Sequence, residues 1–178
     1  MRVLMAALLG VSVVLAAAGP VSAKPPNPCR VLLPADLDTI FEQPWGNGKG
    51  KLGGGCEFLR AEGADVPDIV VSLVVEEKSS VKQAKKVFAR QEEVTRELAD
   101  GVIDIPGLGA PAYYTTLIGV DVLTMRVGKN LAEIRVDRPD DTEATFREQA
   151  VAIGAIVQAR LTPLPPDTKS RETTSTRP

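Results

Sequence analysis

The 178-residue chain carries 21 lysines and arginines against 23 aspartates and glutamates, a balance that gives no electrostatic reason to expect nucleic-acid binding. It contains no histidine, which excludes an imidazole general base, Ser-His and Cys-His catalytic pairs and histidine metal ligands. Aromatic residues make up only 4% of the chain, too few for a base-stacking platform, and we expect no cofactor and no metal site.

Residues 1–23 have the three-part pattern of a cleavable signal peptide. Arg2 lies beside the terminal amine, residues 3–18 are almost wholly apolar, and small or modest side chains at 21–23 follow the helix-breaking pair at 19–20. The alternative is an anchor that stays in the membrane, but the apolar run is shorter than the roughly 20 residues that span a bilayer. We therefore expect a secreted or periplasmic protein with no membrane span after signal removal.

The chain has two cysteines, Cys29 and Cys56. In an exported protein the default is that such a pair forms a disulfide, here expected to stabilise the fold by roughly 3–4 kcal/mol. A reactive thiol or a metal-bound pair is the alternative, although two thiolates alone make a poor zinc site. Cys29 follows a Pro-Asn-Pro sequence instead of small residues, so a lipid anchor is not expected there.

The first third of the expected domain contains one short helix and one short strand. Residues 24–33 form a proline-rich lead that we expect to be extended and not helical. Apolar residues at helical spacing and a proline in the first turn predict a helix over residues 34–42. A flexible glycine-rich connection over residues 46–55 and a strand over 56–60 follow.

The middle of the chain has the strongest strand and helix patterns. Residues 67–76 alternate, with apolar residues on both faces, as is typical of a strand inside a sheet. A long amphipathic helix is predicted over residues 79–99, with Ser80 and Gln83 as a capping box. A loop with apolar side chains follows at 102–109.

Three strands and a helix close the domain. The strands are expected at residues 112–117, 120–127 and 131–136, and the glycine turns between them predict antiparallel neighbours. A helix is predicted over residues 142–161, stopped by a proline. Residues 163–178 are rich in Pro, Thr and Ser and are expected to be disordered.

The resulting order is α-β-β-α-β-β-β-α. It predicts an α+β fold in which helices pack on an antiparallel sheet of about five strands. The expected organisation is a signal peptide at residues 1–23, the lead at 24–33, a single domain at 34–162 and the tail at 163–178.

Several short motifs resemble those of uncharacterised secreted and lipoprotein domains of actinobacteria. They are the Pro-Cys and Leu-Leu pairs within residues 28–33, the glycine-rich approach to 56–58, and the Gly-Leu-Gly segment at 107–109. The resemblance covers residues 28–161 and extends in element order to the PsbP-like α/β group. It implies two cysteines in similar places and a non-enzymatic envelope protein, with no catalytic residue to carry over. The chain departs from the lipoprotein members because it lacks the cysteine that receives the lipid.

Two local patterns suggest chemistry, each with a structural alternative. Ser79 and Lys82 have the Ser-x-x-Lys spacing of penicillin-recognising enzymes, but the companion motifs are missing, and a helix cap explains the serine. An acidic cluster begins at Asp137 and continues at residues 140, 141 and 143. It lacks the turn glycine of a calcium loop, so we interpret it as the start of the last helix.

Seven residues are candidates for contacting a ligand: Trp45, Lys49, Lys51, Arg60, Tyr113, Tyr114 and Arg126. The two lysines lie in the glycine-rich loop, where backbone N–H groups can cradle an anion, although a loop without a ligand is the simpler interpretation. The tryptophan is either an exposed anchor or a cover for the edge of the core. Strand alternation places one tyrosine inward and the other outward, and Arg60, Arg126 and Arg135 are expected to share the outer face.

These observations predict an exported, non-catalytic binding or accessory module of the cell envelope. The expected surface combines the loop over residues 45–55 with that at 107–112. Its partner is either a small ligand or an envelope protein. The alternatives are a cell-envelope hydrolase that uses Ser79 and Lys82, and a subunit devoted to protein–protein interaction.

Overall fold

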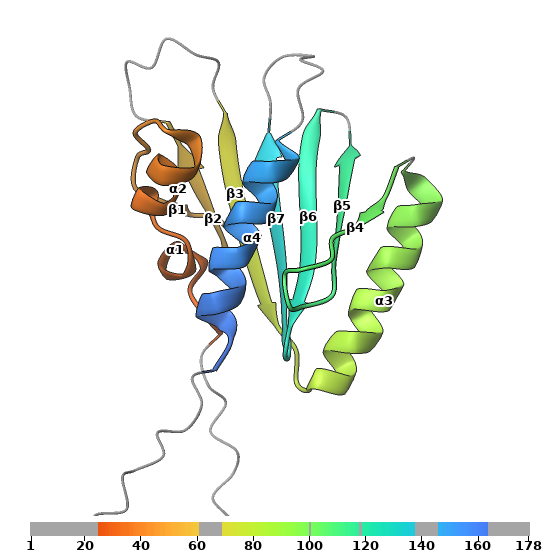
Figure 1. Ribbon diagram of the computed structural model, residues 1–178. Helices are drawn as coiled ribbons and strands as arrows, with labels where there is room; N and C mark the ends of the chain where they lie inside the picture. Colours follow the sequence, from red (N-terminus) through yellow and green to blue (C-terminus); the bar gives the residue numbers. More distant parts are fainter. Residues whose placement is uncertain (1–24, 61–68, 100, 118, 138–145, 164–178) are drawn as a thin grey trace, which may run out of the picture.

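The computed structural model describes residues 25–60, 69–99, 101–117, 119–137 and 146–163. The expected signal peptide and all but the first residue of the expected tail lie outside these ranges. Seven strands form one antiparallel sheet in the order β1-β2-β3-β7-β6-β5-β4 (Figure 1). The strands are β1 Lys49–Gly50, β2 Gly55–Leu59, β3 Val70–Glu77, β4 Ile103–Asp104, β5 Ala112–Leu117, β6 Val120–Val127 and β7 Asn130–Asp137. The helices are α1 Pro28–Val31, α2 Pro34–Phe41, α3 Val81–Leu98 and α4 Arg147–Leu161.

The α+β class and the antiparallel sheet are confirmed, but the predicted order and strand number are wrong. Three short elements were missed: α1, β1 and β4. The proline-rich lead contains a helical turn because Pro28 occupies its first position and the Asn27 side chain accepts a hydrogen bond from the Cys29 N–H. The glycine-rich segment pairs with β2, and the loop at 102–109 pairs with β5, each through two residues that have no strand pattern of their own.

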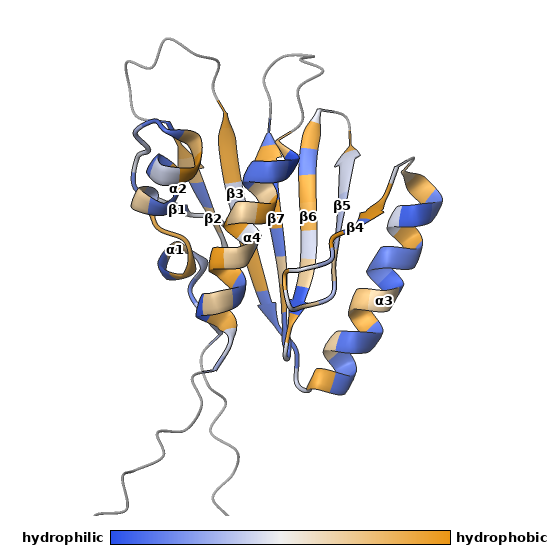
Figure 2. Ribbon diagram, viewed as in Figure 1, coloured by the Kyte–Doolittle hydropathy of each residue, from blue (hydrophilic) through white to orange (hydrophobic). Residues whose placement is uncertain are grey.

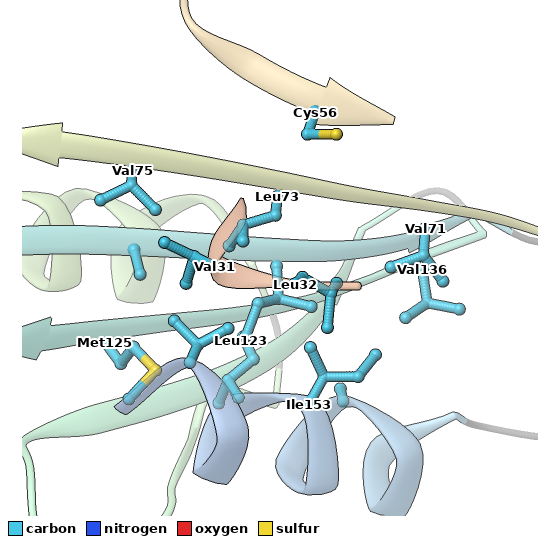
Figure 3. Close-up of a cluster of buried hydrophobic side chains, with 14 of the residues drawn as sticks. Val31, Leu32, Cys56, Val71, Leu73, Val75, Leu123, Met125, Val136 and Ile153 are labelled. Carbon is cyan, nitrogen blue, oxygen red and sulfur yellow. The ribbon is translucent and has the colours of Figure 1, made fainter. Parts of the chain in front are cut away.

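The sheet has one covered face and one more open face, which strand alternation separates. On the covered face, neighbouring strands align Cys56, Leu73, Ile134 and Leu123 in one row. Figure 3 shows these strands meeting α1 and α4 through a cluster of aliphatic side chains. On the open face, the equivalent row consists of Val74, Glu133, Thr124 and Tyr113.

Helix α4 approaches the covered face closely because a glycine lies at the contact. A Cβ atom on Gly154 would lie 2.6 Å from the Leu123 Cδ2 atom. The start of the helix is held by Asp121, a buried residue whose Oδ2 accepts the Phe146 N–H at 2.9 Å. The same carboxylate accepts the hydroxyls of Tyr114 and Thr116. A buried carboxylate on the sheet thus fixes where α4 begins.

The predicted disulfide is confirmed. Cys29 of α1 is bonded to Cys56 of β2, with 5.2 Å between the Cα atoms and a sequence separation of 27. Gly48 packs directly on it, since a Cβ atom there would lie 2.5 Å from the Cys56 Sγ and 2.6 Å from a Phe58 ring carbon. The bond therefore attaches the N-terminal helices to the edge of the sheet, with the β1 approach folded over it.

An ion pair joins α2 to α4. The Arg160 guanidinium donates to both carboxylate oxygens of Asp36, at 2.5 and 2.9 Å, and to the Val31 carbonyl at 2.7 Å. Burial alone would raise the pKa of Asp36, but the hydrogen bonds from Arg160 and the Leu33 N–H outweigh it, so this pKa is lowered. The charged form of Asp36 is therefore favoured in the folded protein.

In the part of the chain that the structure describes, no helix is both apolar enough and long enough to cross a membrane.

Replacing both Cys29 and Cys56 by alanine is expected to destabilise the fold by about 3.5 kcal/mol, the loop-closure entropy of a 27-residue loop. Chemical denaturation of the double variant and of the wild type measures this difference. Adding a reductant should lower the stability of the wild type and leave that of the variant unchanged. Equal stability of the two proteins under oxidising conditions would contradict the prediction.

The stabilisation from Asp36 should depend on pH in a defined direction. Its folded pKa lies below the ordinary value of 3.8, so the contribution is fully present above about pH 5 and is lost as pH falls through the folded pKa. We expect wild type to exceed the Asp36→Asn variant by about 1 kcal/mol near neutral pH, and the gap to close below pH 3.8. Urea denaturation of both proteins over this pH range measures the difference in stability. A difference that grows as pH falls would contradict the prediction.

Candidate functional site

Helix α3 covers only part of the open face. Its cap is as expected, because Ser80 accepts the Gln83 N–H at 3.1 Å. Of its 18 residues only Ala84 and Phe88 are buried. They belong to a small cluster with Tyr113 and Leu131, separate from the main core, and the Phe88 and Tyr113 rings lie 5.5 Å apart. The hydropathy colours in Figure 2 show a largely hydrophilic helix with few apolar positions.

A groove lies between the second half of α3 and the sheet, with a volume of about 530 Å³. This size falls in the range of small-molecule sites, which is roughly 300–1,000 Å³. It is lined by Arg90, Gln91, Val94 and Thr95 of α3, Tyr113, Thr115 and Leu117 of β5, Val120, Val122 and Thr124 of β6, and Glu133 and Arg135 of β7. The strand residues in this set all lie on the open face.

The groove is apolar near β5 and β6 and charged near β7. Strand pairing places Leu117 beside Val120, and the next row toward the middle of the sheet joins Thr115, Val122 and Arg135. On β7, the Arg135 Nε donates to the Glu133 Oε1 at 2.6 Å. An apolar part of a ligand would therefore lie under α3, and a polar part would lie toward β7.

The floor of the groove contains a polar group without a partner. Thr115 is 1% exposed, and its hydroxyl forms no hydrogen bond with any of the described residues. Buried hydroxyls are normally bonded, and leaving one unpaired costs about 1–3 kcal/mol. By contrast, the Tyr113 hydroxyl lies 3.4 Å from that of Thr95 across the groove wall. The Thr115 hydroxyl is thus a specific polar feature at the base of an otherwise apolar wall.

A second, smaller hollow adjoins the first across β7 and β3. It has a volume of about 300 Å³, and among its lining residues are Lys51, Glu57, Ser72 and Asp137. Arg135 lines both hollows. Only its Nε is bonded within the described residues, so its two terminal nitrogens remain available between the two hollows.

Most of the ligand candidates from the sequence lie away from the groove. Trp45 is 6% exposed and packs on Phe41 with ring centroids 5.0 Å apart, so it covers the core edge and is not an exposed anchor. Lys49 is exposed on β1, and Lys51 forms an ion pair with Glu57. The loop over residues 45–55 is therefore not next to the main groove, although Lys51 lines the smaller hollow.

The tyrosine and arginine candidates are divided between the faces. Tyr113 lines the groove, while Tyr114 lies on the covered face and donates to Asp121. Arg126 is on the open face, where it donates to the Gly128 carbonyl at 3.3 Å. Arg60 does not share that face, because its neighbour Leu59 lies on the open face and successive strand residues alternate. The expectation of three arginines on one face holds for two of them.

The other two motifs do not form a site among the described residues. The Ser79 hydroxyl donates to Gln83 Oε1 at 2.5 Å, and Lys82 is exposed to solvent. Of the acidic cluster, Asp137 ends β7, while residues 140, 141 and 143 lie outside the described ranges. No group of three or more potential metal ligands occurs in the described part of the chain.

Sequence reasoning missed the threonines and valines of the groove floor. One signal was available: the outward positions are Tyr, Thr and Leu on β5 and Val, Val, Thr and Arg on β6, so six of the seven are uncharged where a solvated strand face would carry more charges. The sequence does not reveal that these residues face α3, because that depends on which strands the helix crosses.

The chain matches no model of a known protein family and no curated protein. The resemblance to actinobacterial secreted domains therefore stays a prediction.

Loss of the hydroxyl should change the stability of the fold in opposite directions at two adjacent threonines of β5. Thr115→Val removes an unpaired buried group and is expected to stabilise the fold by about 1 kcal/mol. Thr116→Val removes a donor to the buried Asp121, 2.8 Å away, and is expected to destabilise it by about 1.5–3 kcal/mol. Thermal and urea denaturation of the two variants give the comparison. A loss of stability in Thr115→Val would mean that its hydroxyl is satisfied.

Proposed function

We propose that this protein is an exported, non-catalytic binding module that holds a small molecule in the groove between α3 and the sheet. The observation that carries the proposal is the groove itself: about 530 Å³, apolar on one side, with the unpartnered Thr115 hydroxyl in its floor. Binding sites combine these features, namely a concave apolar surface and a few placed polar groups.

The Cys29–Cys56 bond supports the export part of the proposal. Disulfides persist in oxidising compartments and are rare in the cytosol, and this bond ties the N-terminal helices to the sheet. It fits the signal peptide expected at residues 1–23. Detection of the mature N-terminus by mass spectrometry of the exported protein would test the cleavage directly.

The sparse packing of α3 favours a small-molecule site. The helix packs on the sheet through Ala84 and Phe88 in its first half, and near its end Arg96 bonds Asp104 of β4 and the Val102 carbonyl. The groove lies between these two attachments, at Val94 and Thr95, on the face of the sheet opposite the main core. The hydrolase alternative has no such support, because Ser79 and Lys82 lie at the other end of the helix.

Filling the groove should abolish binding. Val120 is partly exposed and lines the apolar end, so Val120→Trp adds bulk to the groove and not to the core. The neutral apolar dye N-phenyl-1-naphthylamine is the probe, and its fluorescence should rise saturably with wild type and bind at least tenfold more weakly to the variant.

Leu59→Trp is the matched control. Leu59 is an exposed apolar residue on the same face, on β2, and lines neither hollow. The Leu59→Trp variant should bind the dye as wild type does, and circular dichroism should show that both variants are folded. Equal dye binding by all three proteins would reject the groove as the site.

A further inference from the structure

We infer that the ligand is an amphipathic molecule with an apolar chain and an anionic head group, held at its head by Arg135. This inference rests on the proposed function, since it names the class of ligand for the same groove. The apolar chain of the ligand would lie under α3 along Val94, Leu117 and Val120. The head would lie over β7, where the two hollows meet.

Arg135 is placed for this role by the strand register. It is in the same row as Thr115 and Val122 on one side and Ser72 on the other, so it lies between the apolar groove and the polar hollow. Its side chain is half exposed, and its pairing with Glu133 uses the Nε alone. The two terminal nitrogens can donate together to a carboxylate or phosphate, a geometry that favours arginine over lysine.

The acidic residues around Arg135 restrict the head group but do not exclude an anion. Glu133 is bonded to Arg135, and Glu57 forms an ion pair with Lys51. Asp137 also lines the smaller hollow. On the helix side, Arg90 adds a second positive charge at the rim, where it pairs with Glu93. A head group with one compact anionic charge fits this arrangement better than a polyanion, because the surrounding carboxylates would repel added charge.

The apolar part of the groove sets the other half of the ligand. Its wall offers branched aliphatic side chains from both α3 and the sheet, and one aromatic ring, that of the buried Tyr113. Such a wall suits an extended aliphatic chain, whose burial contributes about 0.8 kcal/mol per methylene group. The Thr115 hydroxyl lies near the start of that chain, within the row that leads to Arg135.

The test compares dansyl-aminoundecanoic acid with its methyl ester, which has the same chain and no charge. Fluorescence titration of wild type should show the acid binding about tenfold more tightly than the ester. Arg135→Gln should weaken acid binding about tenfold and leave ester binding unchanged. Arg126→Gln is the control, since Arg126 lies on the same face and outside both hollows, and it should match wild type with both probes.

The outcomes separate this inference from the function on which it rests. If acid and ester bind equally and Arg135→Gln changes neither, the anionic head group is wrong, while loss of both probes in Val120→Trp would still support the groove. If the acid binds equally to Arg135→Gln and Arg126→Gln, Arg135 is not the contact. If neither probe binds wild type, both the inference and the proposed groove site are overturned.

Discussion

The Cys29–Cys56 bond is the constraint on which the arrangement of this protein depends. It joins α1 to β2 near the edge of the sheet, and Gly48 lets the next segment fold over the sulfurs at contact distance. With α1 and α2 held there, α4 packs beside them on β6 and β7, and the three helices cover one face of the sheet. On the opposite face, α3 is the one helix among the described residues, and the groove lies beside it.

Two charged residues fix the boundaries of the covered face through their hydrogen bonds. Asp121 receives the hydroxyls of two strand residues and the first N–H at the start of α4, and Arg160 links the end of α4 to α2. Buried polar groups that are satisfied in this way define one geometry, since any other leaves a charge without partners. On the open face, the Thr115 hydroxyl and the terminal nitrogens of Arg135 have no partner among the described residues, so they can bond a ligand in the groove. Buried polar atoms of Trp45, Arg60 and Asn130 are also unpaired, but these residues do not line the groove.

The sequence predicts the parts of this fold that rest on local patterns. The alternation in β3, the capping serine of α3 and the glycine turns between β5, β6 and β7 each have a local physical cause, and each lies where expected. The elements that were missed have none: β1 and β4 are strands only because a neighbouring strand offers hydrogen bonds. The groove belongs to this second group. Val94 looks like an ordinary core position in the stripe of α3, and only the position of the helix over β5 and β6 leaves it partly uncovered.

The two apolar clusters lie on opposite faces of the sheet, so the groove and the main core are built from different side chains. Phe88 and Tyr113 pack with Leu131 on the open face, while the main core lies on the other side of the sheet. Substitutions in the groove therefore change residues that lie on the same strands as core residues but do not contact the core. The changes in unfolding free energy from a groove substitution and a core substitution should add with little coupling. Under the proposed function, a ligand in the groove would contact α3 and the open face without touching α4, which packs on the other face. The strand register would fix the position of the head group on β7, and the stretch of α3 between Phe88 and Arg96, which contains no buried residue, would border the apolar chain of the ligand.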